Sequence, residues 1–491
     1  VLHNGGMRLS RKSVEMTPSA LPAPSLNPLN RPAWRLPSLW LLPWVVSGCA
    51  SVLPTASPAP ALTLPTHWSA TLPGGDAAPA RSLAAWWGHF NDPLLSQLVT
   101  QALQANTSVA SAQAALAQAQ ALRDVKGASL MPGVSASGSA RRSEFSNTSG
   151  TNSFNAGLDA SWSPDVFGGN RSGVDAAQAD ALAASASLTD VQRNITAELA
   201  LAYIQLRGLQ SQLQIARTNL ASQAETLQIT DWRAQAGLIT SLEVAQARAA
   251  TEQTGALIPT LLSTIQKTSH SLAVLTGQAP AALNAQLATP QAVPQVNQQL
   301  ALSIPADTLR QRADVRAAEF RVSAALARVS VAEAARYPSF SIGGSVGLNA
   351  LTLGGLASGA TATAALLGAV SFPLLDGGAT QAQVRAQSAA LTQARSNYQA
   401  TVLTALKDVE DALVGLQANR DRLVRLQAAE AAASQAALLA QSRFASGLID
   451  FQTVLQTQRT LLSTQDSLAT TQADISADHV RLYKALGGGW V

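Results

Sequence analysis

Residues 169–235 read GNRSGVDAAQADALAASASLTDVQRNITAELALAYIQLRGLQSQLQIARTNLASQAETLQITDWRAQ, a run of 67 residues without proline. Small and hydrophobic residues recur along it at alternating steps of three and four: Val174, Ala177, Ala181, Ala184, Leu188, Val191, Ile195, Leu199, Ala202, Leu206, Leu209, Leu213, Ala216 and Leu220. A period of 3.5 residues held this long is typical of a coiled coil rather than of an ordinary amphipathic helix. At about 1.5 Å per residue, the stretch predicts a helix of about 100 Å.

The same pattern occurs a second time, from Gly378 onward. Its small and hydrophobic positions are Val384, Leu391, Tyr398, Val402, Ala405, Val409, Ala412, Leu416, Leu423, Leu426, Ala433, Ala437, Ala440 and Phe444. Both stretches lead into the same three residue types: Gly237-Leu238-Ile239 in the first and Gly447-Leu448-Ile449 in the second. Another helical pattern follows each of them, so we expect two long helices that each reverse into a shorter partner.

The repetition extends over most of the chain. Three further pairs carry it: Met131-Pro132 and Tyr337-Pro338 are 206 residues apart, Gly168-Gly169 and Gly377-Gly378 are 209 apart, and Gly277 and Gly487 are 210 apart. Near-constant offsets indicate an internal duplication. Each copy is predicted to contain a helix, a β-hairpin, a long helix, a turn and a return helix.

The remaining helices have recognisable limits. Asp92 and Pro93 are expected to start the first helix, as N-cap residue and first-turn proline, and its pattern continues to Met131. The first return helix is expected over 242–275, with a kink at Pro259.

Between the helices the sequence changes to segments compatible with β-strands. Residues 134–142 and 154–162 flank a turn-like stretch at 147–150, and residues 339–349 and 361–372 flank a glycine-rich loop. Each segment has about the length of a tilted membrane-spanning strand. The alternation of polar and apolar residues is weak, so a soluble hairpin is an alternative for either pair taken alone.

The first 48 residues have the features of a secretory signal. Basic residues precede the apolar run LPSLWLLPWVV at 36–46, and Val46-Ser47-Gly48 leads into Cys49. This arrangement resembles a bacterial lipoprotein signal, which implies that Cys49 becomes the first mature residue and carries lipid. The aspartate that usually retains such lipoproteins in the inner membrane is absent after the cysteine, which favours the outer membrane.

Charge and composition exclude several functions. Residues 1–48 hold five of the 33 basic and one of the 29 acidic residues, so 28 of each remain and the rest of the chain has no net charge. The pI near 9.5 therefore does not indicate nucleic-acid binding. Cys49 is the only cysteine, so no internal disulfide can form. No apolar run of 18 or more residues follows it, so no transmembrane helix is expected.

No catalytic motif stands out. The five histidines are scattered, and the sequence has no H-E-x-x-H pair and no phosphate-binding loop. Two of the three methionines precede Cys49, which leaves little for a soft-metal path. We therefore expect no enzyme, no cofactor and no metal site.

Two hairpins supply four strands, which are too few to close a barrel. An open edge is not tolerated in lipid, because each unpaired N–H or C=O group costs several kcal/mol there. Transmembrane barrels begin at about eight strands. Two or three chains sharing one barrel are the simplest solutions, and the long helices need partners as well.

A family resemblance rests on Cys49, on the opening Trp86-Trp87-x-x-Phe90-x-Asp92-x-Leu94, on the duplicated pattern and on the two Gly-Leu-Ile turns. Together they resemble the TolC-like outer-membrane factors, and among these the NodT-type lipoproteins that serve resistance-nodulation-division efflux pumps. The resemblance covers residues 49–488. It implies a mainly α fold with a small β part, in which duplicated helix–β-hairpin–long helix repeats form a shared transmembrane β-barrel and a periplasmic α-helical barrel in a homotrimer.

The same resemblance implies a function. The chain would be the passive exit duct for small molecules, docked to a periplasmic adaptor protein that links it to an inner-membrane pump. A type I protein secretion duct is an alternative, although such relatives commonly lack the lipidated cysteine. A structural or adhesin-like coiled-coil lipoprotein would share the helices but has no reason for two matched hairpins.

The resemblance places the two Gly-Leu-Ile turns at the periplasmic end. Gly237 and Gly447 are predicted to supply the left-handed backbone that a helix reversal needs. The neighbouring apolar residues are predicted to be exposed for contact with the adaptor: Leu238, Ile239, Leu448 and Ile449. The alternative is that the glycines are ordinary helix ends and the leucines pack internally.

A gate is expected just after the second turn, where relatives often carry a ring of acidic residues. The matching position here is Gln456, and the carboxylates nearby are Asp450 and Glu243. The candidate gate residues are Asp450, Gln452, Gln456 and Arg459, and without an acidic ring we expect weak cation selectivity. Arg459 could equally form an ordinary ion pair between helices.

These expectations divide the chain into a signal peptide at 1–48, a lipidated tether at 49–84, a first repeat at 85–288, a linker at 289–304, a second repeat at 305–488 and a tail at 489–491. Within the repeats, strands are expected at about 133–163 and 339–372, and long helices at about 169–236 and 378–446. The expected location is the bacterial outer membrane, lipid-anchored and membrane-spanning, with a large periplasmic part.

Overall fold

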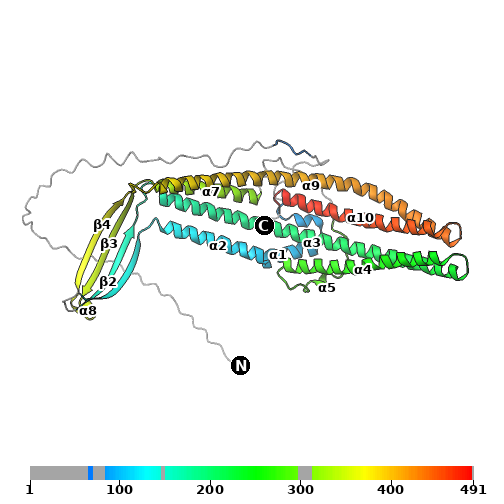
Figure 1. Ribbon diagram of the computed structural model, residues 1–491, viewed down its shortest axis with the longest axis horizontal. Coiled ribbons are helices and arrows are strands. Elements are labelled where there is room, and N and C mark those ends of the chain that lie inside the picture. The colour runs from blue at the N-terminus through cyan, green and yellow to red at the C-terminus, as the bar shows by residue number, and fades with distance from the viewer. Residues whose placement is uncertain (1–64, 70–82, 145–149, 297–311, 489–491) are drawn as a thin grey trace, which may run out of the picture. The chain divides into compact units, whose positions relative to one another are not determined.

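A computed structural model of the protein describes residues 65–69, 83–144, 150–296 and 312–488. Cys49, the predicted signal peptide and most of the predicted tether lie outside the described residues. The expected mainly α fold with a small β part is confirmed (Figure 1). Among the described helices, none combines the length and the apolar character needed to cross a membrane.

The first repeat follows the predicted order. It begins with a short 3-10 helix, η3 (Trp86–Phe90), and the helices α1 (Pro93–Ala105) and α2 (Thr107–Ala128). Then come the strands β1 (Gly133–Ser143) and β2 (Thr151–Trp162), the long helix α3 (Gly169–Gln235), the return helix α4 (Ser241–Leu275) and the one-turn helix α5 (Asn284–Leu287). The helix α4 is continuous through Pro259, where the sequence predicts a kink.

The second repeat has the same plan. Its elements are α7 (Ala313–Ala334), β3 (Ser339–Ala350), the one-turn helix α8 (Gly355–Ser358), β4 (Thr361–Ser371), α9 (Ala379–Ala445) and α10 (Phe451–Ala485). Both long helices have 67 residues, and both return helices have 35.

Left-handed glycines mark the same points in both copies, each pair 210 residues apart: Gly168 and Gly378, Gly237 and Gly447, and Gly277 and Gly487. At the start of the long helices the offset is therefore 210, not the 209 that the adjacent glycines suggest. The duplication is thus nearly free of insertions from the first long helix onward.

The helical stretch predicted to start at Asp92 is divided in two. Asp92 caps α1 as predicted, because its carboxylate accepts a hydrogen bond of 2.9 Å from the N–H of Leu95. The helix nevertheless ends at Ala105, and Asn106 has an extended backbone. The side-chain oxygen of Asn106 accepts a hydrogen bond of 2.8 Å from the N–H of Ser108 and so caps α2.

The helices pack in pairs along the chain. Each return helix lies against its long helix, α4 on α3 and α10 on α9, and α10 also contacts α3 and joins the two pairs (Figure 1). Toward the sheet, α2 packs on α3, α3 on α7 and α7 on α9. The largest core cluster unites residues from η3, α1, α3, α4, α9 and α10, and in it Trp86 stacks on Tyr483 with ring centroids 5.4 Å apart.

The described residues of the predicted tether are attached to the helices. Trp68 is buried in the largest core cluster. The backbone N–H of Ser69 donates a hydrogen bond of 2.8 Å to the carboxylate of Glu410 in α9. The described residues around Trp68 are therefore held against the helices.

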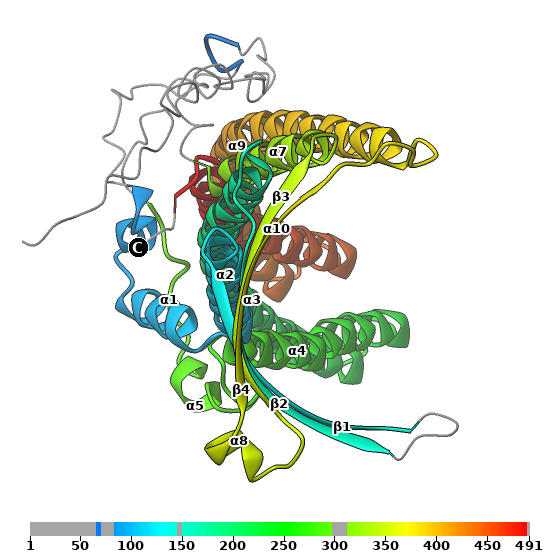
Figure 2. The ribbon, with the colours of Figure 1, turned by 90° about the vertical axis from the view of Figure 1, so that its left-hand side faces the viewer.

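The four strands form one antiparallel sheet in the order β1-β2-β3-β4 (Figure 2). The two hairpins pair through β2 and β3, which lie in the middle, with Leu158 opposite Val346. The edges are β1 and β4, and within the described residues each edge strand has a single partner.

The register gives the sheet two different faces. Directly paired residues point to the same side of a sheet, so the even-numbered residues of all four strands share one face and the odd-numbered residues share the other. The even face carries large hydrophobic side chains: Val134, Phe154, Leu158, Trp162, Phe340, Ile342, Val346, Leu348, Leu366 and Val370. The odd face is mostly serine, threonine, asparagine, glycine and alanine. The alternation is weak in single strands but consistent across the sheet.

Candidate functional site

The candidate site consists of the two tips, the turns at which each long helix reverses into its return helix. At the first tip Gly237 has φ +72°, and at the second Gly447 has φ +76°. The N–H of the following leucine donates back five residues in each case, Leu238 to Arg233 and Leu448 to Arg443, both at 2.9 Å. This is the pattern of a helix closed by a left-handed glycine, as the sequence predicts.

Both return helices begin with a side-chain cap. Thr240 and Glu243 form a capping box at the start of α4, and the carboxylate of Asp450 accepts a hydrogen bond of 2.9 Å from the N–H of Thr453 at the start of α10. The hydrogen bonds from Thr453 hold the pKa of Asp450 below its usual value, and those from Thr240 do the same for Glu243. The two carboxylates nearest the expected gate are therefore charged groups engaged in helix capping.

The four apolar tip residues differ in exposure. Leu238 and Leu448 are 69% and 74% exposed, as predicted. Ile239 and Ile449 are only half-buried, and Ile449 packs against a small hydrophobic cluster. Each tip thus presents one exposed leucine and turns its isoleucine partly inward.

That cluster, here termed the tip cluster, is made of Ala247, Ala250, Ala440, Phe444, Phe451, Val454 and Leu455. It draws on α4, α9 and α10 and so joins the two repeats. The guanidinium of Arg233, in the last turn of α3, lies 4.6 Å from the ring centroid of Phe444. The amide of Gln452 donates a hydrogen bond to the amide oxygen of Gln246 in α4. The two tips therefore contact each other through apolar, cation–π and amide interactions.

Sequence reasoning did not identify Arg233 and Gln246, nor the contact of Phe444, because contacts between residues about 210 positions apart leave no trace in helical periodicity. One signal was available. Arg233 and Arg443 are equivalent in the duplication, but only the second copy has a phenylalanine beside its arginine. An aromatic residue that breaks the repeat near a tip indicates a contact that only one copy makes.

Three of the four candidate gate residues lie on one side of α10, and the fourth, Asp450, is its N-cap. Gln452, Gln456 and Arg459 are spaced by four and three residues and are all exposed. Gln458, on the opposite side, is buried and donates a hydrogen bond of 2.9 Å to the hydroxyl of Thr226 in α3. Arg459 forms no ion pair with any described residue. The exposed stripe is polar and carries one cationic side chain.

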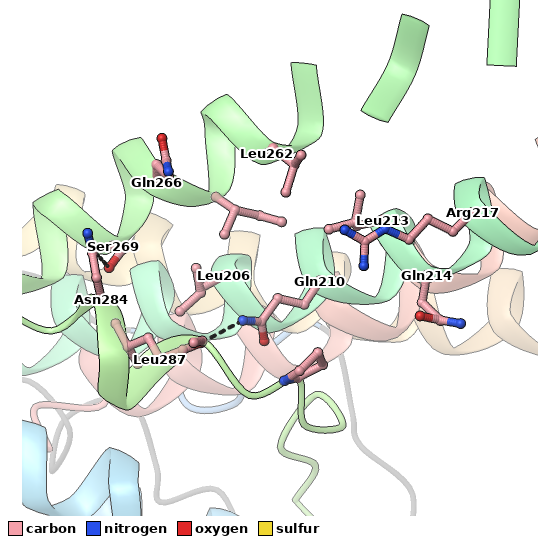
Figure 3. A pocket seen from close by; sticks show the side chains of 13 residues that line it. Leu206, Gln210, Leu213, Gln214, Arg217, Leu262, Gln266, Ser269, Asn284 and Leu287 are labelled. Carbon is pink, nitrogen blue, oxygen red and sulfur yellow. Dashed lines mark hydrogen bonds between the residues drawn. The ribbon is translucent and has the colours of Figure 1, made fainter. Parts of the chain in front are cut away.

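A cavity of about 390 Å³ lies between α3, α4 and the loop that carries α5 (Figure 3). The amide of Gln210 donates a hydrogen bond of 2.8 Å to the carbonyl oxygen of Leu287, and the hydroxyl of Ser269 donates one of 3.0 Å to Asn284. The described lining has no carboxylate, histidine or cysteine, so it offers no general acid or base. Elsewhere in the described ranges, no three histidine, cysteine, aspartate or glutamate side chains gather as a metal site requires.

Comparison with known proteins agrees with this arrangement. A family model described as outer membrane efflux protein matches residues 98–278 and 304–488, which together make up most of the chain. The chain is 30% identical over 457 residues to nodulation protein T from Rhizobium leguminosarum bv. viciae, with 92% of each chain covered. It is 33% identical over 471 residues to the pyoverdine export outer membrane protein OpmQ from Pseudomonas putida, covering 92% of this chain and 97% of that one.

A solved structure of similar fold covers almost the same range. The outer-membrane channel OprN has a TM-score of 0.80 and 32% sequence identity, and the match covers 88% of this chain and 99% of the other.

Proposed function

The chain belongs to the outer membrane efflux protein family, and on this basis we propose that it is the outer-membrane exit duct of a tripartite efflux system. It conducts small molecules passively from a periplasmic adaptor protein and an inner-membrane pump to the outside. Channels of this family are not enzymes. We infer that the energy for transport comes from the pump.

The observation that carries the proposal is the amphipathic sheet, whose edge strands β1 and β4 have no second partner in the part of the chain that the structure describes. Most of the large side chains of its even face are exposed in a single chain, as for Leu366 at 84%, and this suits contact with lipid. The polar odd face suits a water-filled interior. Aromatic residues gather where the sheet meets the helices: Phe167 stacks on Tyr337 with centroids 4.9 Å apart, as in the aromatic girdle of a membrane barrel.

The free edges require further copies of the chain. Because lipid does not tolerate an open strand edge, β1 and β4 must pair with neighbours. Three copies of a four-stranded sheet supply twelve strands, and we infer a homotrimer. Its helices enclose the periplasmic part of the duct, and each neighbour covers apolar residues that are exposed along α9: Leu403, Val414, Val424 and Leu438.

We propose that the exposed leucines at the tips dock the adaptor. Leu238 and Leu448 are presented by equivalent turns, so one adaptor surface can bind either tip. The inferred pump is of the resistance-nodulation-division type, which rests on the NodT-type resemblance. The lipid anchor on Cys49 is inferred on the same ground and would hold the chain at the outer membrane.

We further propose that Asp450, Gln452, Gln456 and Arg459 line the closed end of the duct. The contact between Gln452 and Gln246 supports this, because it holds the two return helices together within one chain. A ring of amides closes by hydrogen bonding but gives no selection by charge, so cation selectivity at the gate is weak.

Reconstitution in planar lipid bilayers tests the duct. The purified full-length protein, and a variant with a loosened tip (Arg233→Gln), are recorded under an applied voltage. We expect discrete conductance steps, more frequent in the variant. If neither protein conducts while both remain folded by circular dichroism, the duct function is wrong.

Aspartate substitutions test the docking surface. Leu238→Asp and Leu448→Asp are expected to weaken binding of the purified adaptor without affecting conductance. The matched control is Leu353→Asp, which changes an equally exposed leucine in the connection between β3 and β4. Equal loss of binding in the control would count against docking at the tips.

A further inference from the structure

The four strands carry only three charged side chains: Arg141, Arg142 and Asp159. The register separates them. Asp159 pairs with Ser135 on one side and Ser345 on the other, and Arg141 pairs with Ser153, so both lie on the odd face. Arg142 pairs with Asn152 on the even face.

Asp159 stands among small uncharged residues. Its neighbours on the odd face are serines and glycines, including Gly157 two residues earlier on the same strand. The hydroxyl of Ser137 donates a hydrogen bond of 2.8 Å to the carboxylate, and no described residue supplies it with a cation. The carboxylate is exposed, and no charge on the described residues neutralises it.

Arg141 lies at the opposite end of the same face. It is six residues from Ser135, the partner of Asp159, which at about 3.3 Å per residue is about 20 Å along the strand. Asp159 is close to the end of β2 that leads into the helices, and Arg141 is close to the turn between β1 and β2. Arg141 forms no ion pair with a described residue.

We propose that Asp159 and Arg141 determine the ion selectivity of the membrane part of the duct, as two separate zones of opposite charge. The inference rests on the proposed function, in which the odd face lines the water-filled interior. Asp159 concentrates cations near the helical end, and Arg141 concentrates anions near the turn. The Debye length is about 10 Å at 0.1 M salt, half the separation, so each zone acts independently.

Two oppositely charged zones in series have a recognisable effect on current. One polarity of voltage drives both kinds of ion into the region between the zones, and the other polarity depletes that region. The open duct is therefore expected to pass more current at one polarity, and this asymmetry is expected to decrease above about 1 M salt, where the Debye length is about 3 Å.

Charge-neutralising variants test the proposal in the Arg233→Gln background. In a KCl gradient, Asp159→Asn is expected to shift the reversal potential toward anion selectivity and Arg141→Gln toward cation selectivity. Both variants are expected to reduce the current asymmetry. Two controls are matched to them: Ser137→Ala removes the hydrogen bond but keeps the charge, and Arg142→Gln neutralises the adjacent arginine on the even face.

The outcomes separate the inference from the duct function. An unchanged reversal potential in a conducting Asp159→Asn variant overturns the proposal, as does an equal shift in Arg142→Gln and Arg141→Gln. Opposite shifts for Asp159→Asn and Arg141→Gln, with both controls unchanged, support it. If the Arg233→Gln protein without a further substitution did not conduct, this result would instead overturn the duct function.

Discussion

The side-chain amide of Asn106 donates a hydrogen bond of 2.8 Å to the carbonyl oxygen of Leu275, and so ties the start of α2 to the end of α4. The second repeat has an equivalent contact, here termed a joint as in the first repeat, but a different type of residue makes it. Arg312, directly before α7, donates a hydrogen bond of 3.0 Å to the carbonyl oxygen of Ala485 at the end of α10. A return helix and the helix before a hairpin are thus joined end to end in both copies.

The joint in the second repeat is also an ion-pair site. The guanidinium of the buried Arg312 pairs with Asp314 and, at 3.1 Å, with Asp408 of α9. Burial opposes the charge of Asp314, but the hydrogen bonds and charges of Arg312 and Arg193 still hold the pKa of Asp314 below its usual value. The second joint therefore depends on charge, and the first does not.

Asn106→Ala is expected to destabilise the protein substantially. The substitution removes the cap of α2 and leaves the carbonyl of Leu275 without its partner in a buried joint, together about 2 to 4 kcal/mol. Asn106→Ser keeps a capping oxygen but is too short to donate to the carbonyl of Leu275, and it is expected to lose part of that amount. Thermal unfolding followed by circular dichroism measures both, and a midpoint of the serine variant equal to that of the unmodified protein would contradict the joint.

Alanine at the tip glycines is expected to cost stability in unequal amounts. A left-handed backbone costs an alanine about 1 to 2 kcal/mol. At Gly447 a Cβ atom would also lie 3.2 Å from the guanidinium of Arg233, whereas at Gly237 it meets open space. Gly447→Ala should therefore lower the unfolding midpoint more than Gly237→Ala does. Gly173→Ala, at an open position inside α3, is the control and is expected to stabilise slightly.

The duplication supplies a matched pair for the contact between tips. Arg233→Gln removes a cation–π contact of about 0.5 to 1 kcal/mol and should raise the open probability in bilayers. Arg443→Gln neutralises the equivalent, exposed arginine of the second repeat and is expected to leave it unchanged. The same increase in both variants would mean that net charge, not the contact with Phe444, controls opening.

His479 is expected to make stability fall at mildly acidic pH. Its Nδ1–H donates a hydrogen bond of 2.8 Å to the carbonyl oxygen of Ile475, and Arg420 donates one of 3.3 Å to Nε2, so the ring must be neutral. Burial, aided by the charge of Arg420, lowers the pKa of His479 below its ordinary value of about 6.5.

Because the folded state disfavours protonation of His479, its contribution is complete above about pH 6.5 and is lost as the pH falls toward the lowered pKa. Unfolding midpoints measured between pH 5 and 8 should therefore vary less in His479→Gln than in the unmodified protein. His270→Gln, a half-buried histidine in α4, is the control. An unchanged pH dependence in His479→Gln would exclude this residue as the cause.

Local signals in the sequence predict much of this fold. Asp92 before a proline, and glycine after each long periodic stretch, determine helix ends through contacts within a few residues, and the structure has them where the sequence places them. Because the chain is duplicated, a helix end predicted in one copy is also predicted in the other. The expected β-hairpins are also found, because their turns likewise depend on residues that are close together in the sequence.

What the sequence could not supply depends on contacts between distant segments. The end of α1 at Asn106 is favoured by a carbonyl 169 residues away. The two faces of the sheet emerge only when the registers of four strands are combined, because no strand alternates clearly by itself. The half-buried Ile449 could not be distinguished from the exposed Leu448 until the tip cluster was placed beside it.

The equal lengths of the two copies restrict how such a protein can evolve. Because the tips contact each other, a seven-residue insertion in α3 alone would move one tip past the other by about 10 Å. A matching insertion in α4 would not restore the contact, since α9 and α10 would still be short. A longer or shorter form of this chain therefore requires four coordinated changes, one in each of the 67-residue and 35-residue helices. The reach of the helical part is thus inherited as a nearly fixed quantity, while single substitutions remain free to alter what the duct admits.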